Sequence, residues 1–126
     1  MNLHPKAPEI LVIGYGNTLR QDDGVGPRVA EELLKRVVDP RVQVLVRPSL
    51  TPELAETISE VRWVVFIDAS AELPKGLVRQ ANVEREGGAD MSLVHFLEPQ
   101  ALLAWSYDLY GRCPNGRAWL VGVEHT

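Results

Sequence analysis

Short apolar runs alternate along the chain with segments of mixed polarity, and this alternation predicts both strands and helices. Five runs favour strands because they are short and rich in β-branched residues, and the fourth, which carries polar residues, is expected at a sheet edge. They span 9–13, 42–46, 63–69, 77–83 and 118–123. Helices are expected at about 27–38, 51–61 and 99–110. The alternation predicts a three-layer α/β fold with a mostly parallel sheet and right-handed crossovers.

Proline, glycine and threonine residues mark the expected helix ends. Pro27 is expected at the first helical position of the first helix, which leaves Gly26 as its cap. Thr51 is expected to cap the second helix, and Gly111 to end the third. Leu102, Trp105 and Leu109 are expected on one side of that third helix.

Composition narrows the class of protein. The chain has 126 residues, of which 45% are hydrophobic and 24% charged, and this predicts one domain over 1–126. A net charge of −4 argues against a nucleic-acid partner, and no apolar run is long enough to span a membrane. The single cysteine, Cys113, cannot form an intrachain disulfide, and the N-terminus has no secretory signal, so we expect a cytoplasmic protein.

Candidate chemistry gathers in loops that follow the expected strands. The glycine-rich stretch from Gly14 to Pro27 joins the first strand to the first helix and holds the adjacent acids Asp22 and Asp23. Asp68 ends the third strand, and His95 precedes the third helix. Loops at the carboxyl ends of parallel strands line a shared crevice. Two carboxylates and an imidazole suit a borderline divalent ion such as nickel, zinc or manganese.

Each candidate also has a structural explanation. An aspartate ahead of a helix commonly caps it, but two adjacent carboxylates repel each other unless a cation or the helix N-terminus compensates them. Asp68 alone could be a turn residue that ends a buried strand. His95, among Leu93, Val94, Phe96 and Leu97, could be a half-buried histidine bonded to backbone. Spacing along the chain does not show that the three side chains converge.

Taken together, these motifs resemble the hydrogenase maturation endopeptidases, which process the large subunit of nickel-iron hydrogenases. The likeness lies in the glycine turn with its acidic pair at fixed spacing, and in weaker segments that occur in the same order. It spans residues 12–17, 22–26, 50–54, 66–69 and 120–123, and so covers nearly the whole chain.

The resemblance implies a fold, a reaction and a site. The family fold is a three-layer α/β/α sandwich around a five-stranded mixed sheet, whose antiparallel strand would be the weak fourth one. Its members remove a C-terminal peptide from the hydrogenase large-subunit precursor after nickel insertion. The family's metal ligands fall on Asp23, Asp68 and His95, with nickel supplied by the precursor and zinc or cadmium as substitutes in crystals. In a rival mechanism, Asp23 and Asp68 act as catalytic acid and base without metal.

One part of the family pattern has no counterpart in this sequence. Family members usually continue past the last strand into a C-terminal helix that covers one face of the sheet, and this helix is missing here. We therefore expect another subunit, a partner, or further residues to cover that face, and a homo-oligomer is one such arrangement.

Two other functions remain open from the sequence. Gly14 and Gly16 could begin the fingerprint of a nucleotide-binding, Rossmann-like module, but Leu19 stands where a third small residue is needed. Aspartates beside a pyrophosphate would also repel it. The third possibility is a non-catalytic protein that keeps the protease fold and binds the precursor without cutting it.

Overall fold

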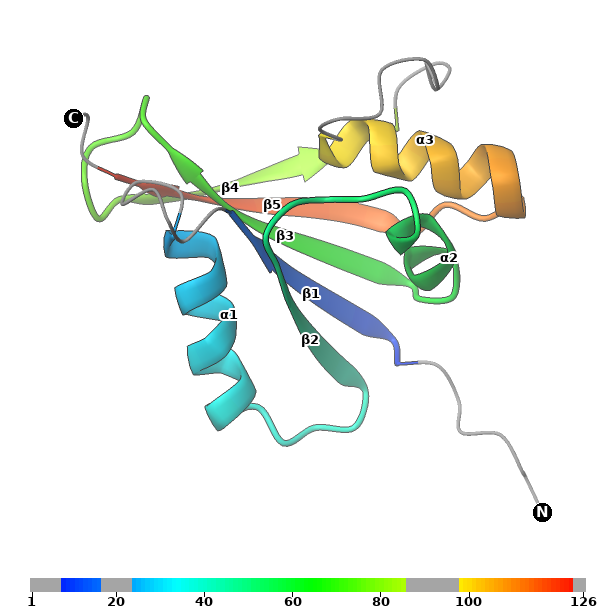
Figure 1. Ribbon diagram of the computed structural model, residues 1–126, viewed down its shortest axis with the longest axis horizontal. Coiled ribbons are helices and arrows are strands. Elements are labelled where there is room, and N and C mark those ends of the chain that lie inside the picture. The colour runs from blue at the N-terminus through cyan, green and yellow to red at the C-terminus, as the bar shows by residue number, and fades with distance from the viewer. Residues whose placement is uncertain (1–7, 17–23, 86–97, 124–126) are drawn as a thin grey trace.

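A five-stranded sheet forms the centre of the molecule in the computed structural model, which describes residues 8–16, 24–85 and 98–123 (Figure 1). The strands lie in the order β2-β1-β3-β5-β4. All neighbours are parallel except β4 and β5, which are antiparallel. The strands are β1 (Ile10–Tyr15), β2 (Val42–Arg47), β3 (Trp63–Ser70), β4 (Val78–Val83) and β5 (Asn115–Gly122).

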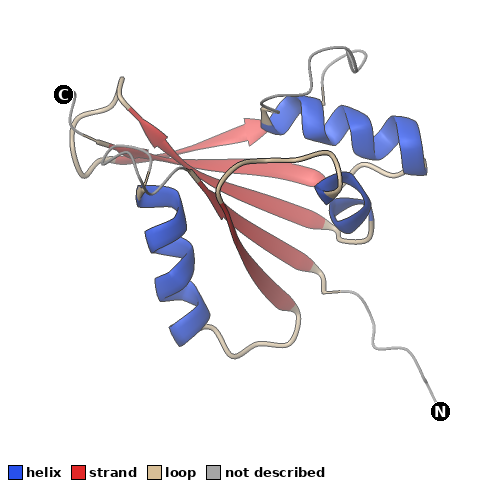
Figure 2. Ribbon diagram, in the orientation of Figure 1, coloured by secondary structure: helices blue, strands red, loops and turns tan. Residues whose placement is uncertain are grey.

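Helices cover both faces of this sheet (Figure 2). Helix α1 (Val25–Arg36) packs on one face against β1, β2 and β3, while α2 (Leu54–Ser59) and α3 (Pro99–Tyr110) lie on the other. Alternate side chains of the central strands enter the two cores: Phe66 of β3 packs on the side of α2 and α3, and Ile67 on the side of α1. The predicted three-layer sandwich around a mixed sheet is confirmed.

The chain reverses direction across the sheet at β1. It passes from β1 through α1 to β2 on one side, and then returns through α2 to β3 on the other side of β1. The loop that leaves β1 leads to α1 on one face, whereas the chain that leaves β3 passes through β4 to α3 on the other face. Such a reversal is where open α/β sheets bind ligands. Gly14 of β1 pairs with Ile67 of β3, so Tyr15 and Asp68 follow side by side at this rim.

Two glycines let α1 approach the central strands closely. A Cβ atom at Gly14 would overlap the carbonyl oxygen of Gly26 and the side chain of Ala30. A Cβ atom at Gly26 would overlap the carbonyl oxygens of Tyr15 and Ile67. The amino end of α1 is thus fixed directly behind the rim formed by β1 and β3.

The helix boundaries confirm some sequence predictions and correct others. Helix α3 spans the predicted residues and ends at Gly111, whose φ of 72° is left-handed. Helix α1 begins at Val25 with Gly24 as its cap, so the placement of Pro27 at the first helical position and of Gly26 as cap was wrong. Proline is tolerated throughout the first turn, because the first four N–H groups of a helix have no partner inside it.

Two further expectations about the helices need correction. Helix α2 is capped at Glu53 rather than Thr51, with no side-chain capping bond, and it ends at Ser59. Leu109 of α3 is 50% exposed, whereas Leu103 is buried together with Leu102. The buried face of α3 therefore differs from the predicted one, because it includes Leu103 and leaves out Leu109.

Strand β4 confirms the predicted edge strand and is also the antiparallel strand that the family resemblance implied. None of the helices in the described part of the chain is long and apolar enough to cross a membrane.

Candidate functional site

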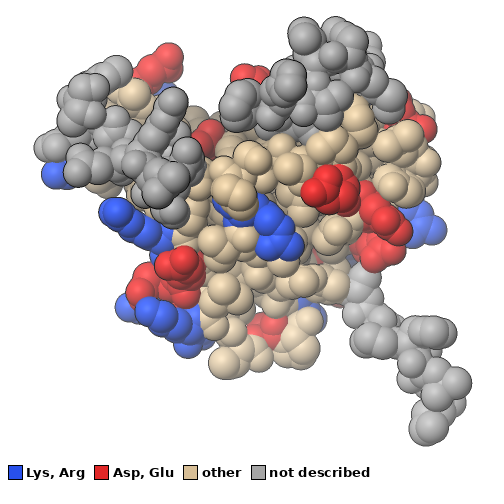
Figure 3. Space-filling view, viewed as in Figure 1, with Lys and Arg blue, Asp and Glu red and all other residues tan. Residues whose placement is uncertain are grey.

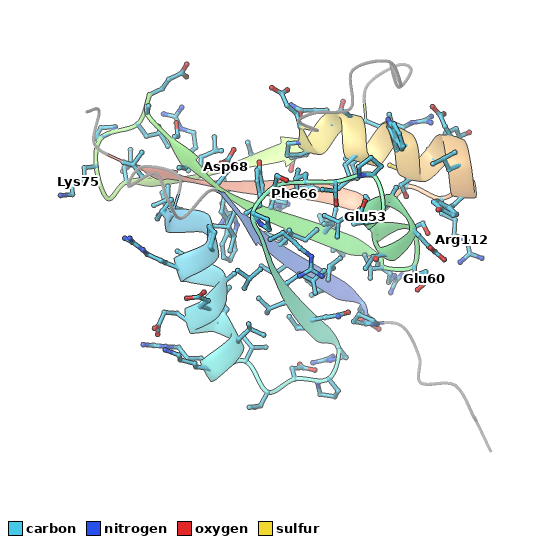
Figure 4. The ribbon with its side chains drawn as sticks, in the orientation of Figure 1. Glu53, Glu60, Phe66, Asp68, Lys75 and Arg112 are labelled. Carbon is cyan, nitrogen blue, oxygen red and sulfur yellow. The ribbon has the colours of Figure 1, made fainter. Side chains whose placement is uncertain are left out.

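A cleft of about 440 Å³ opens at the rim where β1 and β3 end. Its floor is formed by the sheet face that α2 and α3 cover, and its walls by the segment after β2 and the start of α3. In Figure 4, Asp68 lies near the carboxyl end of β3 at this cleft. The lining includes Tyr15, Gly16, Ser49, Leu50, Asp68, Ala81, Asn82, Val83, Glu98, Ala118 and Leu120.

A hydrogen bond joins the two central strands inside the cleft. The hydroxyl of Tyr15 donates to Oδ2 of Asp68 over 2.9 Å. The Tyr15 ring meets Phe66 edge to face, with ring centroids 6.5 Å apart. Burial, and then the Asp68 carboxylate, raise the pKa of the Tyr15 hydroxyl well above its ordinary value of 10.0. Tyr15 therefore stays protonated and acts as a donor that orients Asp68.

A second carboxylate, Glu98, lines the same cleft. Glu98 precedes α3 as its cap residue and is exposed, and its charge also raises the pKa of Tyr15. Neither Tyr15 nor Glu98 was singled out from the sequence. Tyr15 could have been, because it stands at the carboxyl end of the first strand, and Glu98 because it directly precedes Pro99 at a helix start.

The structure places one of the three predicted ligands. Asp68 is half-buried in the cleft, at the carboxyl end of β3 where the sequence predicted it. Asp22, Asp23 and His95 lie outside the described residues, so the meeting of Asp23, Asp68 and His95 stays a prediction. Within residues 8–16, 24–85 and 98–123, no group of three or more His, Cys, Asp or Glu side chains could hold a metal ion. The carboxylates of Asp68 and Glu98 are oxygen donors of the kind that a divalent ion accepts.

Charged side chains form no basic patch on the described surface shown in Figure 3. Lys and Arg are scattered there, while acidic residues gather over α2, which carries Glu56 with Glu53 and Glu60 beside it.

The known proteins that this chain resembles are hydrogenase maturation proteins. No protein-family model matches the chain. The hydrogenase expression/formation protein HupD of Bradyrhizobium diazoefficiens is 36% identical over 111 residues, which are 84% of this chain and 57% of HupD. The hydrogenase 2 maturation peptidase from a Thaumarchaeota archaeon is 28% identical with a TM-score of 0.60, over 92% of this chain and 79% of that one. The chain belongs to the hydrogenase maturation protease family.

The fold of the hydrogenase maturation proteases extends over nearly the whole chain. The maturation protease HycI from Thermococcus kodakarensis superposes with a TM-score of 0.72 over 94% of this chain and 76% of its own, at 24% identity. The chain spans little more than half the length of HupD, 57%.

Proposed function

We propose that this protein is an endopeptidase that removes the C-terminal extension of a nickel-iron hydrogenase large-subunit precursor after nickel insertion. The observation that carries the proposal is Asp68, held by Tyr15 in a cleft at the sheet reversal, in a chain of the hydrogenase maturation protease family. A carboxylate at such a rim can bind a metal or exchange a proton with an entering peptide.

Recognition of the precursor is proposed to act through its own nickel. Asp23, Asp68 and His95 would share the ion with the thiolates that already hold it, so only loaded precursor would be cut. Nickel is then part of the substrate, and zinc or cadmium can replace it as a probe. We propose that the reaction takes place in the cytoplasm and that the protein associates with itself.

A processing assay tests the activity directly. Nickel-loaded precursor is incubated with the wild-type protein and with the variants Asp68→Asn and His95→Ala, and product is followed by mass. Each variant should lose at least about 100-fold in rate, since both remove a proposed metal ligand. Asp108→Asn, at an exposed position of α3, is the matched control and should process normally.

Three outcomes would contradict the proposal. Normal processing by Asp68→Asn would take this carboxylate out of the reaction. Binding of precursor without cleavage by the wild-type protein would favour the non-catalytic alternative. Soaking crystals with cadmium should place anomalous density at Asp68, whereas density for an added dinucleotide in the same cleft would favour the nucleotide-binding alternative.

A further inference from the structure

Among the residues that the structure describes, strand β4 forms an edge of the sheet beside the cleft. It is the last strand of the sheet, and it pairs on one side with β5. Val78, Arg79, Gln80 and Asn82 are exposed. Ala81, Asn82 and Val83 line the cleft that contains Asp68, so the edge and the cleft are continuous.

The pattern of backbone hydrogen bonds shows which groups of β4 face outward. The amides of Asn115 and Val123 donate toward β3, to Arg62 and Ser70, so odd-numbered residues of β5 point to β3. Even-numbered residues of β5 therefore point to β4, as the bond from Gly122 N–H to the Leu77 carbonyl shows. In the register of the two strands, even-numbered residues of β5 lie opposite odd-numbered residues of β4. The backbone groups of the odd-numbered residues of β4 therefore point to β5, and those of the even-numbered residues point the other way.

It follows that Val78, Gln80 and Asn82 direct their N–H and C=O groups away from the sheet. Among the described residues, no backbone group bonds to them. The outward row contains no proline, although proteins commonly place proline or a bulge on an edge to prevent pairing. A row of alternating donors and acceptors is matched by the main chain of another extended segment.

We propose that the β4 edge docks an extended segment of the precursor as an added sixth strand. This inference rests on the proposed function, because it assigns the segment to the protease's own substrate. The added strand would lie three strand spacings from β3, about 14 Å, which an extended chain covers in about four residues. The docked segment therefore lies some four or more residues from the bond cut at Asp68.

Charge defines one feature of this segment. Arg79 lies opposite Leu120, which in turn lies opposite Asp68, so Arg79 is on the cleft face of β4. An acidic side chain on that face of the added strand would pair with Arg79 across the two strands.

A second copy of the chain fits this edge less well than a peptide does. A six-residue strand is about 20 Å long and a sheet layer about 10 Å thick, so pairing two β4 edges buries roughly 400 Å² in total. Stable interfaces between proteins bury about 1,200 Å² or more. A peptide that continues from β4 into the cleft gains the further contact that a second copy would lack.

The test removes one outward N–H group. In Gln80→Pro the ring replaces the outward amide hydrogen and leaves the bonds to β5 in place, since proline is accepted at outward positions of edge strands. Gln80→Ala is the matched control, because it loses the same side chain but keeps the amide. For cleavage of nickel-loaded precursor, we expect Gln80→Pro to raise KM about tenfold with kcat unchanged, and Gln80→Ala to behave as wild type.

Each result decides the question. An unchanged KM in Gln80→Pro, while the wild type cleaves normally, would overturn the docking inference and leave the proposed function standing. If the wild type does not cleave, the equilibrium affinity for the precursor is measured instead, and a tenfold loss in Gln80→Pro alone would support docking without the protease function. Val78→Pro, at the first residue of the strand, replaces Gln80→Pro if that variant does not fold. A wild-type dimer that dissociates in Gln80→Pro during sedimentation would overturn the inference in favour of a second copy.

Discussion

Removing the Tyr15 hydroxyl tests whether this residue positions Asp68. The variant Tyr15→Phe loses the 2.9 Å hydrogen bond to Oδ2 but keeps the ring that packs on Phe66. No cavity is created, because phenylalanine fills the space of the tyrosine ring. The change therefore separates the hydrogen bond from the packing of the rim.

The expected loss of stability is small and the expected loss of function is larger. A hydrogen bond to a charged group contributes about 1.5–3 kcal/mol, and the half-buried Asp68 can accept water in its place, so we expect a loss of about 1 kcal/mol. For a domain of this size that corresponds to about 4 °C in Tm. Loss of a partner that orients a metal ligand typically lowers metal affinity or activity about 10- to 100-fold.

The change in Tm measures the loss of stability. Cadmium binding to the isolated protein, followed by calorimetry, and precursor processing measure the loss of function. Tyr110→Phe, on the exposed end of α3, is the control and should change neither quantity. Equal cadmium affinity in Tyr15→Phe and wild type, with the stability loss alone observed, would show that the hydroxyl supports the fold but does not position Asp68. A processing rate that falls about 10- to 100-fold while the Tm falls by only about 4 °C would support positioning most directly.

Two further predictions concern the fold and its pH dependence. Gly26→Ala should destabilise the protein by about 2–3 kcal/mol in urea unfolding, because its Cβ atom would overlap two backbone carbonyl oxygens. Gly24→Ala is the control and should have little effect, because its Cβ atom would lie 3.6 Å from its nearest neighbour. Equal losses of stability in the two variants would contradict the argument that Gly26 is needed for close approach. Hydrogen bonds from Arg41 lower the pKa of Asp39 from 3.8 to about 2, so the stability they add is complete above pH 3.8 and is lost as the pH falls through 2. Carboxyl NMR titration should give that midpoint in the wild type and a higher one in Arg41→Ala, which keeps only the backbone N–H bond to Asp39. A wild-type midpoint near 3.8 would disprove the interaction.

The elements predicted best from the sequence are those whose ends are marked by proline or glycine, or whose residues are deeply buried. Helix α3 was predicted to the residue because Pro99 and Gly111 fix its two ends through their own backbone geometry. Strand β3 was predicted because an uninterrupted apolar run between turns suits a strand buried on both faces. Helix starts were predicted less well, since Pro27 and Pro52 are each compatible with several positions in or near a first turn.

The position of Asp68 at the rim of the sheet was predicted from the sequence, but the residues beside it were not. Asp68 was predicted because the end of a buried parallel strand is also the rim of the sheet. The role of Tyr15 depends on which strands become neighbours, and spacing along the chain does not reveal that β1 lies beside β3. Glu98 enters the cleft because α3 begins there, which is again set by tertiary packing. Whether Asp23 and His95 join them stays a prediction.

The reversal of the chain at β1 determines when the hydrogen bond between Tyr15 and Asp68 can form during synthesis. The two partners of the bond inside the cleft stand 53 positions apart, and a complete helix, a strand and a second helix lie between them. A nascent chain that has formed β1, α1 and β2 still lacks the acidic half of the pair, and it gains that half only when β3 inserts on the vacant flank of β1. The cleft is complete only later still, because β4, the start of α3 and β5 also line it and are made after β3.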